Sequence, residues 1–158
     1  MNPAWRLALT FFLAASLGGC SIGGPAITVD DARIAQQTDD AVQFQIHLKA
    51  QNKTETPMRL LEYTYSVSVD GQQVYEGRRA AIATLAANST TQLMLPAVAP
   101  RSAMKNLSAV SLANGRYSVS GTLTFVEPGT VAKVLYDARI LRPVQGFDGS
   151  GEILASID

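Results

Sequence analysis

Few side chains in this sequence could do chemistry, and they lie far apart along the chain. The 158 residues include one histidine, His47, and one cysteine, Cys20. A lone imidazole makes neither a structural zinc site nor a catalytic triad. His47 also lies between Gln45 and Lys49, on the polar side of an alternating segment. We therefore expect His47 to be an exposed strand residue.

Two acidic doublets, Asp30-Asp31 and Asp39-Asp40, could supply paired carboxylates. Adjacent strand residues point to opposite faces of a sheet, so Asp30 and Asp31 should be unable to share a proton or flank one bond. Asp39-Asp40 is expected in a hairpin loop as solvated turn residues, with a loose calcium site as the alternative. The segment from Asp148 to Glu152 lacks the ligand spacing of an EF-hand loop, and we expect a mobile tail there.

The balance of acidic and basic residues excludes further classes of function. Thirteen basic and 13 acidic residues give zero formal net charge, which argues against a nucleic-acid partner because such a partner requires a basic face. The basic doublet Arg78-Arg79 is expected on an edge strand, where charge prevents aggregation; contact with anionic lipid headgroups is the alternative. The sequence shows no glycine-rich phosphate loop and no cluster of metal ligands. We expect no catalytic, metal or cofactor site, and no enzyme activity.

The first twenty residues have the order of a secretory signal. Arg6 precedes an uncharged, mostly apolar run from Leu7 to Leu17, which is much shorter than the roughly 20 residues of a membrane-spanning helix. The run ends in Leu17-Gly18-Gly19-Cys20, which resembles the lipobox of bacterial lipoproteins. The alternative is a buried cysteine in an apolar N-terminal helix.

The lipobox resemblance implies a processed and anchored protein. Residues 1–19 would be the signal peptide, Cys20 the lipidated N-terminus, and residues 20–26 a short tether. Two or more acyl chains hold a protein stably on a membrane, so the expected partner is a membrane. Ser21 follows the cysteine, and by resemblance to enterobacterial sorting a residue other than Asp there implies the outer membrane, with the domain facing the periplasm.

From Ile27 onward, apolar and polar residues mostly alternate, as in half-buried strands. The clearest runs are Val42 to Ala50 and Leu61 to Val69. Asp70-Gly71 follows the second run and predicts a type I′ hairpin turn. A two-residue loop would place Val67 opposite Val74, and the next turn is expected at Glu76-Gly77.

The rest of the chain completes an all-β pattern. Further strands are expected over residues 80–85, 90–98, 117–126 and 131–141, and one short helix over 102–112, with Ser102 as its N-cap. Gly121 interrupts an alternating run and indicates a bulge or close backbone packing. About seven strands separated by turns favour an immunoglobulin-like β-sandwich. The absence of the Cys…Trp…Cys trio makes it fibronectin type III-like rather than antibody-like.

The order of these segments is similar to a known family. The expected strand from Phe44 to Asn52 is followed by Pro57-Met58-Arg59-Leu60 and then by a strand that ends in VSVDGQQVYEG. After it come TLAANS, over residues 84–89, and the apolar segment QLMLPAV, over residues 92–98. This pattern resembles the water-stress-and-hypersensitive-response (WHy) domain of the late embryogenesis abundant superfamily, as found in bacterial envelope lipoproteins. It covers about residues 27–142, which leaves residues 143–158 as a C-terminal tail. Asn52-Lys53 stands where the family usually has Asn-Pro, so Pro57 takes over that turn or the loop has another shape.

The resemblance implies a non-enzymatic, immunoglobulin-like module associated with desiccation or stress protection. Together with the lipobox, it predicts a lipid-anchored envelope protein that is protective under desiccation or other stress. The alternative is an envelope scaffold lipoprotein that binds a protein partner through the sandwich, for example along a sheet edge. A third possibility is a small apolar ligand held between the sheets.

Overall fold

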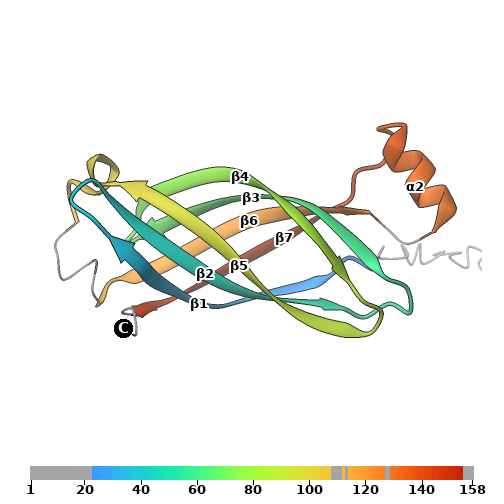
Figure 1. The fold of residues 1–158 in the computed structure, drawn as a ribbon, viewed down its shortest axis with the longest axis horizontal. Helices are drawn as coiled ribbons and strands as arrows, with labels where there is room; N and C mark the ends of the chain where they lie inside the picture. The colour runs from blue at the N-terminus through green and yellow to red at the C-terminus, as the bar shows by residue number, and fades with distance from the viewer. Residues whose placement is uncertain (1–22, 108–111, 113, 127–128, 155–158) are drawn as a thin grey trace, which may run out of the picture.

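The computed structural model describes residues 23–107, 112, 114–126 and 129–154. These residues form seven strands in one sheet, with one short α-helix and a 3-10 turn (Figure 1). The strands are β1 (Ala26–Gln37), β2 (Ala41–Asn52), β3 (Met58–Val69), β4 (Gln72–Leu85), β5 (Ser89–Pro100), β6 (Arg116–Val126) and β7 (Val144–Leu154). The 3-10 helix η1 spans Arg101–Met104 and the α-helix α2 spans Thr130–Asp137.

The first and last strands meet in the middle of the sheet. The strand order is β4-β3-β6-β7-β1-β2-β5, and all neighbours are antiparallel except β1 and β7, which run parallel. That parallel pairing joins two groups of strands that would otherwise be separate layers. The expected all-β fold of about seven strands is confirmed. The immunoglobulin-like or fibronectin-like sandwich is not, because a single curled, nearly barrel-like sheet takes its place (Figure 1).

The core fills the inside of this curled sheet. Alternation places every second side chain of β2 and β3 inward, as the sequence predicted.

The largest fully buried side chains are Tyr65, Phe44, Ile46, Leu48, Met58, Leu60, Leu85, Leu95, Leu123, Val42, Val67 and Val69. Side chains from β2, β3, β5 and β6 therefore meet in one mainly aliphatic core.

The β3–β4 hairpin confirms the predicted turn but not its register. Asp70 and Gly71 have φ angles of 48° and 80°, as a type I′ turn requires. The pairing shifts just before the turn, so Val67 lies opposite Tyr75 rather than Val74. The turn expected at Glu76-Gly77 is wrong, because β4 runs unbroken through it. A side chain at Gly77 would overlap the Tyr75 ring, which explains a glycine within a strand.

The later elements confirm three expected strands and correct two other expectations. Residues 80–85, 90–98 and 117–126 lie in β4, β5 and β6. Residues 131–141, expected as a strand, instead contain α2, because Val131, Val134 and Leu135 recur at helical spacing. The helix expected over 102–112 is a 3-10 turn in its first part, and residues 108–111 lie outside the described residues. None of the described helices is long and apolar enough to cross a membrane.

The expected C-terminal tail is also wrong, since Val144–Leu154 forms β7 between β6 and β1. Phe147 and Ile153 are buried, and Gly149 and Gly151 occupy the inward positions between them. A side chain at Gly149 would overlap Val29. Because two of the four inward positions from Phe147 to Ile153 are glycines, the sequence of β7 does not show alternating apolar residues.

Candidate functional site

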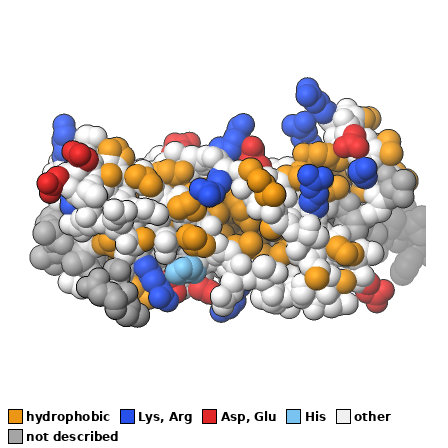
Figure 2. Space-filling model, in the orientation of Figure 1, with side chains coloured by type: hydrophobic (Ala, Val, Ile, Leu, Met, Phe, Trp, Pro, Cys, Tyr) orange, Lys and Arg blue, Asp and Glu red, His pale blue; other side chains and the backbone are white. Residues whose placement is uncertain are grey.

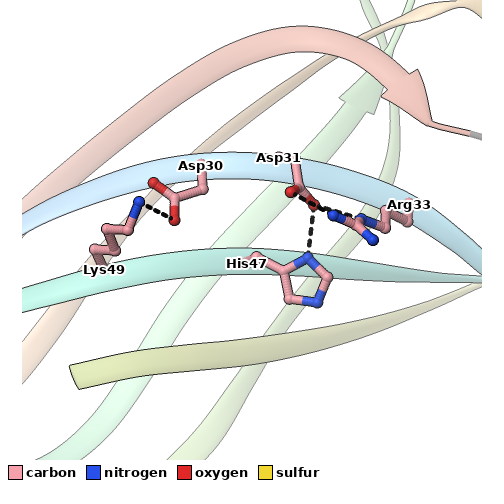
Figure 3. Close-up of polar contacts among 5 residues, drawn as sticks. All are labelled: Asp30, Asp31, Arg33, His47 and Lys49. Carbon is pink, nitrogen blue, oxygen red and sulfur yellow. Dashed lines mark hydrogen bonds and ion pairs between the residues drawn. The ribbon is translucent and has the colours of Figure 1, made fainter.

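A small group of charged side chains joins β1 to β2 on the outside of the sheet (Figure 3). Arg33 donates two hydrogen bonds of 3.0 Å to the Asp31 carboxylate. Nδ1 of His47 lies 2.6 Å from Oδ1 of the same carboxylate. His47, expected to be exposed, is thus half-buried, with 34% of its side chain accessible. We call Asp30, Asp31, Arg33, His47 and Lys49 the charged cluster.

The second carboxylate of the doublet reaches the same face. Nζ of Lys49 lies 2.9 Å from Asp30 Oδ2, and His47 and Lys49 share one side of β2. The pairing of β1 with β2 shifts between Val29 and Asp31, so Asp30 is an extra residue in a β-bulge. The expectation that Asp30 and Asp31 point to opposite faces is therefore wrong, because the bulge breaks the alternation.

The charged cluster acts as an electrostatic link between two strands. The Arg33 hydrogen bonds lower the pKa of Asp31 from its usual 3.8, and the His47 contact lowers it further, while desolvation opposes both. The Asp31 contact raises the pKa of Arg33. Among the described residues, no three His, Cys, Asp or Glu side chains are placed to hold a metal ion. The geometry shows charge pairing rather than an assembled reaction centre.

A surface rich in hydroxyl groups covers the outside of β3 and β6. The register places Thr64 opposite Thr122, Ser66 opposite Ser120, and Ser68 opposite Ser118. The Ser66 and Ser120 Oγ atoms are 3.2 Å apart. A shallow groove of about 290 Å³ runs over this surface, lined in part by Thr64, Ser66, Ser120 and Thr122. We call these paired outward residues the hydroxyl face: Thr64, Ser66, Ser68, Ser118, Ser120 and Thr122.

The sequence contains a signal for the hydroxyl face. Serine and threonine occupy the outward positions of both TYSVS and SVSGT, and alternation alone predicts that each set shares a face. The pairing of β3 with β6, which are far apart in the chain, could not be predicted from it. Gly121 supports this pairing, because a side chain there would overlap the Thr64 carbonyl and Tyr65 Cβ. The expected close packing at Gly121 is confirmed.

Asn52 is a buried polar residue whose structural role was not predicted from the sequence. Its Nδ2 lies 2.9 Å from the Thr56 carbonyl and 3.0 Å from the Ala86 carbonyl. Its Oδ1 accepts hydrogen bonds from the backbone N and the hydroxyl of Thr54, at 3.0 and 2.8 Å. Asn52 therefore joins the β2–β3 loop to the β4–β5 turn.

The other residues considered in the sequence lie in loops, on an edge strand or outside the described residues. Asp39-Asp40 lies in the loop between β1 and β2, as expected. Arg78-Arg79 lies on β4, which is an edge strand, and Arg78 Nε is 3.4 Å from Glu62 Oε1. The lipobox residues Leu17, Gly18 and Gly19 and the lipidation candidate Cys20 lie outside the described residues, so their role remains a prediction.

A family model described as late embryogenesis abundant protein matches residues 47–134. This match covers more than half of the chain, and the chain belongs to the late embryogenesis abundant protein family. The resemblance drawn from the strand order is confirmed at this level. No curated protein matches the chain in sequence.

Solved structures share the fold. The solution structure of AT1g01470 from Arabidopsis thaliana has a TM-score of 0.66 and 20% identity, covering 87% of each chain. The solution structure of a late embryogenesis abundant (LEA) protein, At2g46140.1, has a TM-score of 0.61 and 20% identity, covering 84% of this chain and 71% of the other. A crystal structure of a protein from Archaeoglobus fulgidus has a TM-score of 0.52 and 18% identity, covering 79% and 97%. These likenesses show the fold alone.

Proposed function

We propose that this chain is a lipid-anchored envelope protein that protects neighbouring molecules during desiccation or other stress without catalysing a reaction. Membership of the late embryogenesis abundant family supports a stress-related role. The observation that carries the proposal is the hydroxyl face, a paired array of side chains on the outside of two adjacent strands.

The physical basis is replacement of water. The sheet pairs its backbone donors and acceptors internally, so most of them do not depend on solvent. Each serine or threonine hydroxyl can donate one hydrogen bond and accept others. As water is lost, the hydroxyl face can bond to the polar surface of a neighbouring protein or lipid headgroup that would otherwise be left unsatisfied.

Drying a labile enzyme with the purified protein tests the protective role. The test variant carries Ser66→Ala, Ser120→Ala and Thr122→Ala, which remove hydroxyls from the face. The matched control carries Thr28→Ala, Thr84→Ala and Thr90→Ala, at three exposed threonines elsewhere. We expect recovered activity to fall to that of an inert protein with the test variant and to be retained with the control. Equal recovery with both variants would refute the role of the hydroxyl face.

The anchor is supported by the lipobox sequence and is tested separately. Mass spectrometry of the N-terminal peptide from membranes should show a cleaved chain that begins at acylated Cys20. An intact Met1 or a free Cys20 thiol would refute the anchoring.

A second candidate function rests on the edges of the sheet. The strands β4 and β5 are the two edges, and Ile82, Met94 and Val98 on them are exposed. Such an edge can add a strand from a partner protein, which favours an envelope scaffold role. Cross-linking in intact cells from a probe at Ile82 should then capture one reproducible envelope protein, and no reproducible capture would exclude this candidate.

A further inference from the structure

The α2 helix leaves two of its valines in solvent, while Ala132, Leu135 and Tyr136 on the same helix are half-buried. Lys133, Tyr136 and Asp137 line a pocket of about 470 Å³ together with Pro57 and Arg59 at the end of the sheet. The Val131 and Val134 residues are 72% and 61% exposed. Helices on soluble domains usually bury their apolar side against the core, so this arrangement leaves an apolar surface without a partner among the described residues.

The chain after α2 extends this surface. Ile140 and Val144 are 74% and 60% exposed, and Arg139 and Arg142 are exposed beside them. Figure 2 shows basic side chains gathered at this end of the molecule. We call Val131, Val134, Arg139, Ile140, Arg142 and Val144 the α2 surface. Apolar side chains interspersed with cations are typical of helices that lie in a membrane interface.

The start of the described chain lies at the same end. A side chain at Gly24 would come within 2.7 Å of Gln145 Oε1 and 3.2 Å of the Phe125 ring, and these residues flank the segment that carries α2. Cys20 lies four residues before Gly24, a reach of at most about 14 Å. Acyl chains on Cys20 would therefore enter a bilayer close to the α2 surface.

We propose that the α2 surface lies on the bilayer, with its valines and Ile140 in the headgroup region and its arginines paired with anionic phosphates. This inference rests on the proposed anchoring of Cys20. A bilayer is a better partner for this surface than a second copy of the chain. In a symmetric dimer the α2 surfaces of the two copies would face each other, and the Arg139 and Arg142 cations of both would be brought together. Anionic lipid attracts each of these charges instead.

Fluorescence of the full acylated lipoprotein in vesicles tests the inference. An environment-sensitive probe is attached at Val134→Cys, with Asp39→Cys, in the β1–β2 loop, as the control. Acylation blocks the Cys20 sulfur, so only the new thiol is labelled. In vesicles of phosphatidylglycerol and phosphatidylcholine, we expect a blue shift and quenching by a lipid-phase quencher at position 134 but not at position 39. Arg139→Glu with Arg142→Glu should reduce both effects, as should high salt.

Each outcome decides a different point. Unshifted, unquenched emission at position 134 in a protein with acylated Cys20 would overturn the inference and leave the anchoring intact. An unacylated Cys20 would overturn the anchoring and the inference with it. Probe–probe contact at position 134 without lipid quenching would assign the surface to a second copy and also overturn the inference.

Discussion

At the scale of single residues, the Asp31 carboxylate links β1 to β2 through Arg33 and His47. The folded-state pKa of Asp31 is below its usual 3.8, so its stabilising effect is present above that value and is lost as pH falls through the folded pKa. We predict that Asp31→Asn lowers the free energy of unfolding near neutral pH. The difference from the native protein should be constant above the usual pKa of 3.8 and should shrink as pH falls from that value through the lower folded-state pKa.

Urea unfolding at a series of pH values measures this difference. The matched control is Asp148→Asn, which removes one exposed carboxylate elsewhere on the sheet. A native-to-Asp31→Asn difference that stays constant or grows toward acid pH would contradict the prediction.

Two buried tyrosines on β3 provide a matched pair. The Tyr65 hydroxyl donates to the Pro96 carbonyl at 2.5 Å. The Tyr63 hydroxyl is buried and has no hydrogen-bond partner in the described part of the chain, and burial raises the pKa of Tyr63 to about 12. We predict that Tyr65→Phe lowers the free energy of unfolding by about 1–2 kcal/mol, while Tyr63→Phe leaves it unchanged or raises it. Chemical denaturation measures both, and a larger loss for Tyr63→Phe would contradict the assignment.

Asn52 offers a third test at this scale. Asn52→Ala leaves the Thr56 and Ala86 carbonyls without their amide donor, so we predict a loss of about 1–3 kcal/mol in the free energy of unfolding. Gln51→Ala, at the exposed neighbouring position, should change it little. Equal losses for the two variants would show that the Asn52 bonds do not stabilise the loops.

The sequence predicted single residues only where local rules decide their place. The Asp70-Gly71 turn follows from two residues and is confirmed. The charged cluster could not be predicted, because the bulge at Asp30 depends on how β1 pairs with β2. The role of Asn52 in joining two loops could not be predicted, since its Ala86 partner lies 34 residues further along the chain.

At the scale of elements, β7 is a strand in which glycines take inward positions, so the sequence lacks the alternating apolar residues that predict a strand. Gly149 faces inward against Val29, whereas a side chain at Gly146 would meet open space. We predict that Gly149→Ala lowers the free energy of unfolding by about 1–3 kcal/mol and that Gly146→Ala has a much smaller effect. Thermal unfolding of the two variants measures the contrast, and similar melting temperatures would contradict the close packing of β7 on β1.

Alternation predicted β2, β3 and β6 because most of their inward positions hold apolar residues, and the apolar segment QLMLPAV predicted β5. The sequence pattern did not predict the elements whose inward positions lack large apolar residues or whose apolar residues have another spacing. In β7 the inward Gly149 and Gly151 carry no hydrophobic side chain. Residues 131–141 were expected as a strand, but Val131, Val134 and Leu135 have helical spacing and lie in α2.

At the scale of the whole molecule, the parallel contact of β1 with β7 determines the architecture. It joins the two ends of the chain and makes one curled sheet from strands that would otherwise form two layers. Strand number and turn positions do not contain this information, because the contact is between residues more than a hundred positions apart. The all-β class was therefore predictable from the sequence, and the nearly barrel-like form was not.

We propose that the anchored, internally bonded sheet protects a nearby surface as water is lost. Leakage of a trapped dye from vesicles that carry the acylated protein, measured after drying and rehydration, tests it most directly. We predict less leakage with the native protein than with the Ser66→Ala, Ser120→Ala, Thr122→Ala variant at equal density. Equal leakage from both, matching vesicles without protein, would contradict the claim.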